Sequence, residues 1–307
     1  MPKVVGGRRG QVRSWGAGLL ATMLGACAPY PLVDVPSENQ GSRIRQLVLH
    51  FTSEPYAEAR RLLTEPTAHP VSAHYLVPEP GDPTRGRERV VVHRLVPEAR
   101  RAWHAGASSW DGETALNNSS IGVEIVNVSR CEPAPGVVDV VGPEDERCRF
   151  LPYPEAQLEA VVALARDILA RNPDIEPWRV VGHADVAPAR KADPGPRFPW
   201  RRLHEAGVGA WYEEATLARQ RLAVGPGPVD LLRLQRALAA WGYALEPTGE
   251  LDPATRWVVR AFHLHFRPEA WQAPPDGESL AIVLALLERY RPERLAVLEP
   301  SPVSAAR

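Results

Sequence analysis

The chain has 307 residues, 24% of them charged, and a formal net charge of −1 at pH 7. This length suggests two domains with one sizeable core, and the balanced charge excludes the basic surface expected of a nucleic-acid-binding protein. The 32 prolines cluster outside the periodic segments, so we expect many rigid turns between the regular elements.

We interpret residues 1–26 as an export signal. Three arginines precede a mostly apolar run, Trp15 to Leu24, which is shorter than the roughly 20 residues of a membrane-spanning helix. The run leads into Leu24-Gly-Ala-Cys27, which resembles the lipobox of bacterial lipoproteins, where the cysteine carries the lipid. The alternative is an ordinary secretory peptide with an incidental cysteine. We expect a lipid on Cys27, a tether over residues 27–42 and, because residue 28 is not aspartate, retention in the outer membrane.

The sequence after residue 42 predicts buried strands that are followed by polar side chains. The apolar run Ile44 to Leu49 ends in His50, which would lie at the rim of a sheet, although a histidine there is more often structural. After a short helix at Tyr56 to Leu63, two further strands are predicted at Val71 to Pro78 and Val90 to Leu95. The loop Ala102-Trp-His-Ala-Gly106 combines an aromatic ring with a histidine, which suits ligand binding.

The strand predicted at Ser120 to Val126 carries a carboxylate in its interior. Alternation places Ile121, Val123 and Ile125 on one face and Glu124 on the other, beside Gly122. An unpaired buried carboxylate is costly, and a glycine in a strand allows close approach of another group. We therefore expect Glu124 to face a site.

Cys131 and Cys148 predict a disulfide, because export would place this even pair in an oxidising compartment. The segment between them, Glu132 to Arg147, is rich in proline, glycine, valine and acidic residues, and we expect a long surface loop. A bridge that closes this loop would contribute about 3 kcal/mol to stability.

A helix from Pro154 to about Arg171 and a short strand at Trp178 to Val181 precede His183. The eleven residues from His183 to Asp193 offer two metal ligands and a cation, Lys191. One more imidazole would complete a three-ligand zinc site with its fourth position open. The alternative is that His183 caps a strand and Asp193 lies in a proline-rich turn. The mixture of strands and helices predicts an α/β domain with a central sheet covered by helices.

The sequence of the C-terminal part predicts three helices after a linker, Gly225-Pro-Gly-Pro228. They are Leu231 to Trp241, a helix that starts at Pro253 with Asp252 as its N-cap, and Leu280 to Leu287. No cluster of catalytic residue types is present, so we expect this domain to add affinity and no chemistry. A polar tail is expected from residue 291.

Five motifs occur in an order that resembles the zinc N-acetylmuramoyl-L-alanine amidases related to T7 lysozyme and the peptidoglycan recognition proteins, most closely the AmiD-type outer-membrane lipoproteins. They are the strand end at His50, Ser72-Ala-His-Tyr75, Ala102-Trp-His-Ala-Gly106, Asn118-Ser-Ser-Ile-Gly-Val-Glu124 and Gly182 to Pro196. The resemblance implies an α/β fold with a central mixed β-sheet flanked by helices. We expect the catalytic domain at residues 43–224.

Residues 229–290 resemble a peptidoglycan-binding domain of type 1, after the linker 225–228 and before the tail 291–307. The resemblance is carried by Leu234-Gln235, Gly242-Tyr243, Gly249 and Asp252-Pro-Ala-Thr255. It implies a small three-helix domain that binds the cell wall.

The resemblance implies roles for seven residues. Zinc would be bound by His50, His183 and Asp193, where it lowers the pKa of a bound water and polarises the scissile carbonyl. Glu124 would transfer the proton, and Lys191 would stabilise the oxyanion. Tyr75 and His104, by their positions in the motifs, are expected to line the substrate groove.

The implied reaction is hydrolysis of the amide bond between N-acetylmuramic acid and L-alanine in peptidoglycan or muropeptides, during cell-wall turnover or recycling. We expect a monomer, lipid-anchored in the cell envelope at the outer membrane and facing the periplasm, with no nucleic-acid partner. The alternatives are a non-catalytic peptidoglycan receptor and a zinc peptidase that cuts within the stem peptide. The complete ligand set argues against the first, and the Ser-Ile-Gly-Val-Glu strand together with the His183-to-Asp193 spacing argues against the second.

Overall fold

The computed structural model describes residues 33–81 and 90–298 of the chain. Residues 33–41 belong to a unit separate from the one that begins at residue 42, and they contain no helix or strand. The expected signal peptide and Cys27 lie outside the described residues. Within the described ranges, no helix combines the length and the apolar character needed to cross a membrane.

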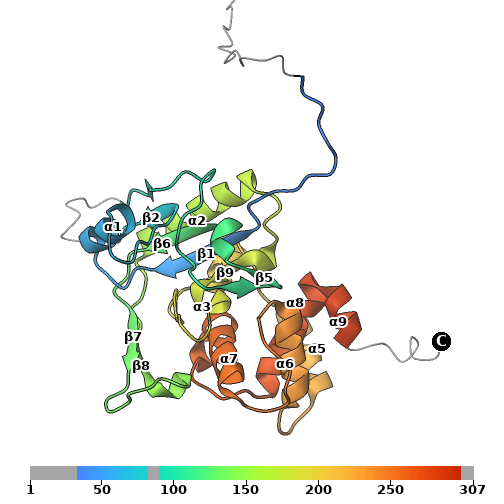
Figure 1. The fold of residues 1–307 in the computed structure, drawn as a ribbon. Helices are drawn as coiled ribbons and strands as arrows, with labels where there is room; N and C mark the ends of the chain where they lie inside the picture. Colours follow the sequence, from blue (N-terminus) through green and yellow to red (C-terminus); the bar gives the residue numbers. More distant parts are fainter. Residues whose placement is uncertain (1–32, 82–89, 299–307) are drawn as a thin grey trace, which may run out of the picture. The chain divides into compact units, whose positions relative to one another are not determined.

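A five-stranded mixed sheet lies at the centre of the unit that starts at residue 42 (Figure 1). Along the sheet the strands are β3 (His93–Arg94), β2 (Tyr75–Val77), β6 (Ser120–Ile125), β1 (Gln46–Phe51) and β9 (Val180–Gly182). β1 runs parallel to β6 and β9, β2 runs parallel to β6, and β3 is antiparallel to β2. The predicted mixed sheet is confirmed, although β2 and β3 are shorter than expected.

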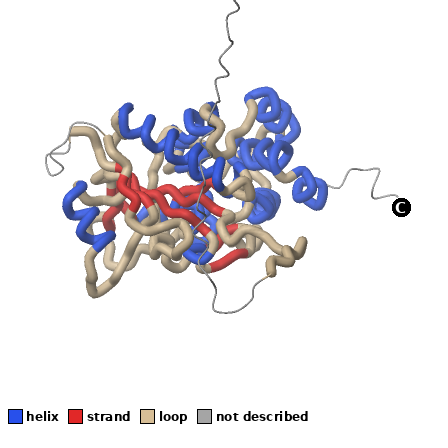
Figure 2. The backbone as a smooth tube through the Cα atoms, turned by 90° about the horizontal axis from the view of Figure 1, so that it is seen from above, coloured by secondary structure: helices blue, strands red, loops and turns tan. Residues whose placement is uncertain are grey.

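Helices surround this sheet (Figure 2). Helix α2 (Glu155–Arg171), predicted from the sequence, buries an apolar face that includes Leu158, Val161, Ala165 and Ile168. The Gln157 side chain at its start donates a hydrogen bond to the Val126 carbonyl at 2.8 Å. The remaining helices of this part are α1 (Tyr56–Thr64), α3 (His183–Val186) and α4 (Trp200–Glu205), and a small hairpin pairs β4 (Ser109–Trp110) with β5 (Glu113–Thr114).

The segment expected to be a surface loop is a β-hairpin at its ends. β7 (Arg130–Pro133) and β8 (Glu146–Arg149) are antiparallel, and Cys131 lies directly opposite Cys148, to which it is joined by a disulfide. The bridge holds the two ends of the segment together, so their backbones pair although their sequence lacks an apolar alternation. The hairpin projects from the sheet towards the C-terminal helices (Figure 1).

The C-terminal part contains five α-helices in the described residues. They are α5 (Glu214–Val224), α6 (Leu231–Trp241), α7 (Pro253–Phe266), α8 (Gly277–Tyr290) and α9 (Pro292–Leu298). Asp252 caps α7 as expected, since its carboxylate accepts a hydrogen bond from the Thr255 amide at 2.7 Å. α5, which we expected in the catalytic domain, packs against α8, and α9 occupies the start of the expected tail.

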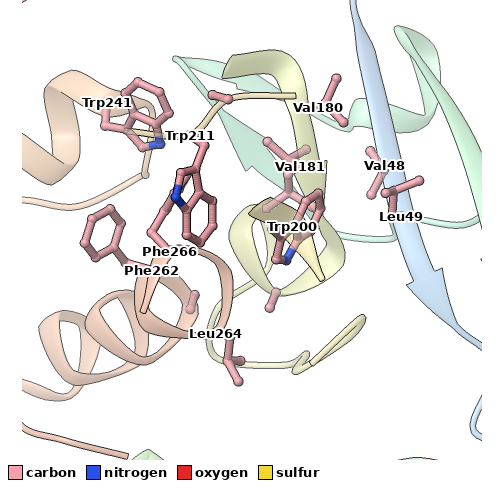
Figure 3. Close-up of a cluster of buried hydrophobic side chains, with 14 of the residues drawn as sticks. Val48, Leu49, Val180, Val181, Trp200, Trp211, Trp241, Phe262, Leu264 and Phe266 are labelled. Atoms are coloured by element: carbon pink, nitrogen blue, oxygen red, sulfur yellow. The ribbon is translucent and has the colours of Figure 1, made fainter. Parts of the chain in front are cut away.

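One hydrophobic core joins the sheet to these helices (Figure 3). It runs from strand residues through aromatic rings to the inner faces of α6 and α7, and includes Val48, Leu49, Val180, Val181, Trp200, Trp211, Trp241, Phe262, Leu264 and Phe266. The helical part therefore shares its core with the sheet, in contrast to a module that folds and acts independently.

Candidate active site

Parallel pairing brings the candidate residues to one edge of the sheet. His50 and Glu124 are partners in the register of β1 and β6, and His183 directly follows β9, the other neighbour of β1. Side chains of register partners point to the same face of a sheet. His50 Nδ1 consequently lies 4.0 Å from Glu124 Oε1.

Three potential ligand atoms converge beside this pair. His50 Nδ1 lies 2.9 Å from His183 Nδ1 and 3.1 Å from Asp193 Oδ2, and His183 Nδ1 lies 3.2 Å from the same oxygen. Around a tetrahedral ion with bonds of about 2.0–2.1 Å, the ligand atoms are about 3.3 Å apart. The spacing of the cluster therefore matches the size of such an ion.

The proton on His183 can be assigned from its other nitrogen. His183 Nε2 lies 3.1 Å from the carbonyl oxygen of Ala105, which can only accept a hydrogen bond. Nε2 therefore carries a proton, and in the neutral ring Nδ1 directs a lone pair at His50 and Asp193.

A chain of hydrogen bonds makes the same assignment for His50. The Ser120 hydroxyl donates to the Leu116 carbonyl at 2.6 Å, so its oxygen accepts from His104 Nε2 at 3.1 Å. Burial holds the pKa of His104 well below its usual range, so the ring is neutral and its Nδ1 can only accept. His50 Nε2 donates to this atom at 3.0 Å, which leaves the lone pair of His50 Nδ1 directed into the cluster.

With these tautomers, neither of the Nδ1 atoms in the cluster carries a proton. Burial, with the nearby His183, lowers the pKa of His50 to about 4, so the His50 imidazole is neutral near pH 7. Two nitrogen lone pairs and the Asp193 carboxylate then face one another in a buried site, where His50 is 1% and Asp193 5% exposed. A cation satisfies all three, so the residues fit a metal ion.

Gly122 provides the space for the His104 ring. A Cβ atom at position 122 would lie 2.3 Å from His104 Cγ, so a larger residue cannot occupy this position while the ring stays in place. His74, the other histidine nearby, accepts a hydrogen bond from the Gly122 amide at 3.0 Å and donates to the Arg100 carbonyl at 3.1 Å. His74 thus supports the strand, and its nitrogens do not reach the cluster.

Glu124 and Lys191 line a cavity of about 320 Å³ next to the cluster. The Glu124 side chain is 14% exposed, and its Oε2 has no hydrogen-bond partner among the described residues. Burial raises the pKa of Glu124 well above its usual range, and the Asp193 charge adds to this effect while Lys191 opposes it. Lys191 makes no side-chain hydrogen bond or ion pair within the described part of the chain, so its ammonium group is available to a ligand.

Tyr75 does not reach this cavity, contrary to our expectation. It pairs with Val123 in the register of β2 and β6, so it points to the face opposite Glu124. Its hydroxyl donates to Glu98 at 2.7 Å, and it lines a separate cavity with Arg94 and Arg171. Its position in the sequence motif did not reveal which face of the short strand it would occupy.

The structure adds cavity residues that sequence motifs did not indicate. Arg190 donates to the Ala105 carbonyl at 3.1 Å, and Glu146 comes from the disulfide-bonded hairpin. Arg260 comes from α7 in the C-terminal helices. Arg190 directly precedes Lys191 in the stretch from His183 to Asp193. No local signal could have found Glu146 and Arg260, because they reach the cavity only through the packing of distant segments.

Comparison with protein families identifies two parts of the chain. Residues 40–196 match the family described as N-acetylmuramoyl-L-alanine amidase, and residues 229–270 match a putative peptidoglycan binding domain. The chain belongs to the N-acetylmuramoyl-L-alanine amidase family. The amidase family and enzyme class expected from the sequence motifs are thereby confirmed.

Individual relatives agree with this assignment. The amidase is 41% identical over 250 residues to "N-acetylmuramoyl-L-alanine amidase AmiD" of Escherichia coli K12, covering 81% of this chain and 84% of the relative. It is 36% identical over 149 residues to "1,6-anhydro-N-acetylmuramyl-L-alanine amidase AmpD" of Enterobacter cloacae, covering 46% of this chain and 64% of that protein.

Solved structures resemble the amidase over most of its length. AmpDH3 from Pseudomonas aeruginosa has a TM-score of 0.74 and 40% identity, over 85% of this chain and 99% of that one. AmiD from E. coli, in complex with "the substrate anhydro-N-acetylmuramic acid-L-Ala-D-gamma-Glu-L-Lys", has a TM-score of 0.71 and 39% identity, over 83% and 93% of the two chains. The amidase therefore shares the fold of these enzymes, including the helical C-terminal part.

Proposed function

We propose that this amidase uses a zinc ion held by His50, His183 and Asp193 to cleave the bond between N-acetylmuramic acid and L-alanine in muropeptides, including those with an anhydro sugar. The observation that carries this proposal is the convergence of two imidazole lone pairs and one carboxylate beside Glu124 and Lys191. Nitrogen and carboxylate ligands in a set of three are typical of catalytic zinc. The similarity to AmiD, described with an anhydro-muropeptide substrate, supports the choice of substrate.

When bound, zinc supplies a water of lowered pKa and a Lewis acid for the scissile carbonyl. The unpartnered Oε2 of Glu124 can accept the proton of the attacking water. The same carboxyl group can then donate this proton to the amine of L-alanine as the carbon–nitrogen bond breaks. The raised pKa of Glu124 suits both steps, because it strengthens the base and makes the acid form accessible.

Lys191 provides positive charge for the oxygen of the tetrahedral intermediate. It lines the same cavity as Glu124, His183 and Asp193, and its ammonium group has no partner in the described residues. An uncommitted cation beside the reacting carbonyl stabilises the negative charge that develops there.

Mass spectrometry of a digested anhydro-muropeptide tests this function. We expect a free anhydro-N-acetylmuramic acid and a peptide whose L-alanine amine is exposed, with the reaction stopped by a chelator and restored by zinc. Cleavage between stem amino acids would identify a zinc peptidase instead. Binding of the muropeptide without cleavage by the zinc-loaded protein would identify a receptor.

We also propose that the protein is a monomeric lipoprotein, anchored through Cys27 in the outer membrane and facing the periplasm. The lipobox-like Leu24-Gly-Ala-Cys27 supports the anchor, and the Cys131–Cys148 disulfide supports export to an oxidising compartment. Cys27→Ser should move an active enzyme from the membrane fraction to the soluble fraction. Wild-type protein that lacks an acyl mass on Cys27 would refute the anchor, and light scattering measures the oligomeric state.

A further inference from the structure

The C-terminal helices contribute a guanidinium group to the wall of the catalytic cavity. Arg260, in the middle of α7, lines the cavity that also contains Glu124, Lys191 and Asp193. Arg260 is only 4% exposed, and burying an arginine without compensating polar contacts would destabilise the folded protein. The neighbouring part of the cavity wall is the disulfide-bonded hairpin, which provides Arg130 and Glu146.

Two contacts hold the Arg260 side chain and leave some of its N–H donors without a partner. Its Nη1 donates to Glu146 Oε2 at 2.5 Å, and its guanidinium carbon lies 4.7 Å from the centre of the Trp257 ring. Its Nε is buried and has no partner among the described residues. Since a guanidinium group has five N–H donors, the pairing with Glu146 leaves several of them for a ligand.

A second cavity of about 410 Å³ meets the first at this arginine. Arg260 and Glu146 line both cavities, and the second is otherwise formed by residues of the hairpin segment, of α7 with the preceding Leu251, and of the segment before α8. These include Pro143, Arg256, Trp271, Pro274 and Pro275. A ligand that leaves the metal cluster along this wall therefore passes the Arg260 guanidinium group.

The charge of the cavity favours an anionic ligand. Its wall contains four cations, Arg130, Arg190, Lys191 and Arg260, and three carboxylates, Glu124, Glu146 and Asp193. The metal ion would add positive charge to this excess. The peptide in the AmiD complex contains a γ-linked D-glutamate directly after L-alanine, and a γ-linkage leaves the α-carboxylate of that residue free.

We propose that Arg260 binds this free α-carboxylate, so that the C-terminal helices and the disulfide-bonded hairpin form a stem-peptide subsite of the catalytic cavity. This inference rests on the proposed function, because it takes the stem peptide as the ligand. The helical domain then recognises the substrate within the catalytic cavity itself, whatever further affinity for the cell wall it provides.

Calorimetry with two peptides tests the proposal on the full-length, zinc-loaded protein. The peptides are L-Ala-D-γ-Glu-L-Lys with the glutamate α-carboxylate free and the same peptide with that group amidated. We expect the free acid to bind wild-type protein about 10- to 100-fold more tightly, the scale of a charge-assisted hydrogen bond. In Arg260→Gln the ratio of the two affinities should fall to about one.

Two further variants separate recognition from folding. Arg260→Lys keeps the positive charge and should keep most of the preference. Arg256→Gln is the matched control, one turn earlier on α7, where Arg256 lines only the second cavity and pairs with Glu144 at 3.2 Å. It should leave the preference unchanged.

Equal binding of the two peptides by wild-type protein would overturn the proposal, and this result requires no variant to fold. An equal loss of affinity for both peptides in Arg260→Gln would also overturn it, because a merely structural arginine cannot distinguish an acid from an amide. Cleavage of the muropeptide by the same preparations is measured separately, so a failure of the proposed amidase function is recognised independently of peptide binding.

Discussion

Asp185 Oδ2 accepts a hydrogen bond from His265 Nδ1 at 2.8 Å, and this contact links the turn that carries His183 to helix α7. The same oxygen accepts from the Gly182 amide at 2.7 Å, and the other carboxylate oxygen accepts from the Tyr243 hydroxyl at 2.5 Å. All of these partners are buried. The C-terminal helices therefore hold the residue that caps the metal-ligand turn, in addition to sharing the core.

Breaking this contact should affect the metal site as well as the stability. We expect His265→Leu to lower the free energy of unfolding by about 3 kcal/mol, because it leaves a buried carboxylate with fewer donors. It should also weaken zinc binding, measured by competition with a chromophoric chelator. His69→Leu, at an exposed position, is the control.

Truncation after Val224 should likewise affect both the stability and the active site. It removes the whole of α6 to α9 and exposes core residues such as Val181 and Trp200. We expect loss of cooperative unfolding and of activity on small soluble muropeptides. A truncated protein that keeps both would show that the helices only add affinity for the wall.

His104 should support metal binding without contacting the metal. His104→Leu removes the acceptor that orients the His50 proton, so Nε2 of His50 loses its partner. Loss of such a partner typically lowers metal affinity by about 10- to 100-fold. Zinc titration of the variant measures this effect. Unchanged affinity in a folded His104→Leu protein would contradict the hydrogen-bond assignment.

Glu124→Gln should retain zinc and lose turnover. The amide keeps the shape of the side chain but cannot accept the proton of the water, and general acid–base catalysis supplies about 10²- to 10⁴-fold. The rate on an anhydro-muropeptide and the zinc content are measured on one preparation. A fully loaded variant with a wild-type rate would remove Glu124 from the mechanism.

Lys191→Met should lower kcat by about 10²- to 10³-fold, the usual cost of one lost oxyanion donor. Methionine retains much of the apolar stem but has no charge. Because Asp193 is only two residues away, a displaced ligand could produce the same loss. The zinc content therefore has to equal that of the wild type before the loss is assigned to the transition state.

His263 should make stability fall in mild acid. Burial, with the charge of Arg267, lowers its pKa from 6.5 to about 4, so the unfolded chain binds this proton more readily than the folded protein. Stability is then full above pH 6.5 and decreases towards pH 4, by about 3 kcal/mol for this shift. Urea unfolding of wild type and His263→Gln between pH 4 and pH 6.5 measures this contribution. If the free energies of unfolding of the two proteins change in parallel with pH, His263 does not contribute.

Several features followed from the sequence because they depend on neighbours along the chain. The alternation around Glu124 placed it on the face opposite Ile121, Val123 and Ile125, and the register confirms this face. The cap at Asp252 is made within three residues, so its side chain and Pro253 were sufficient to predict it. The family motifs likewise named His50, His183 and Asp193 before their geometry was known.

The tertiary structure decided what these patterns could not. Whether Tyr75 faces the site depended on its pairing with Val123, and a three-residue strand has too little alternation to reveal it. Arg260 and Glu146 meet across 114 residues, and His50 and His183 across 133. Such contacts arise when a shared apolar core packs distant segments together, and core packing depends on the whole set of buried side chains. No local stretch of sequence carries that information.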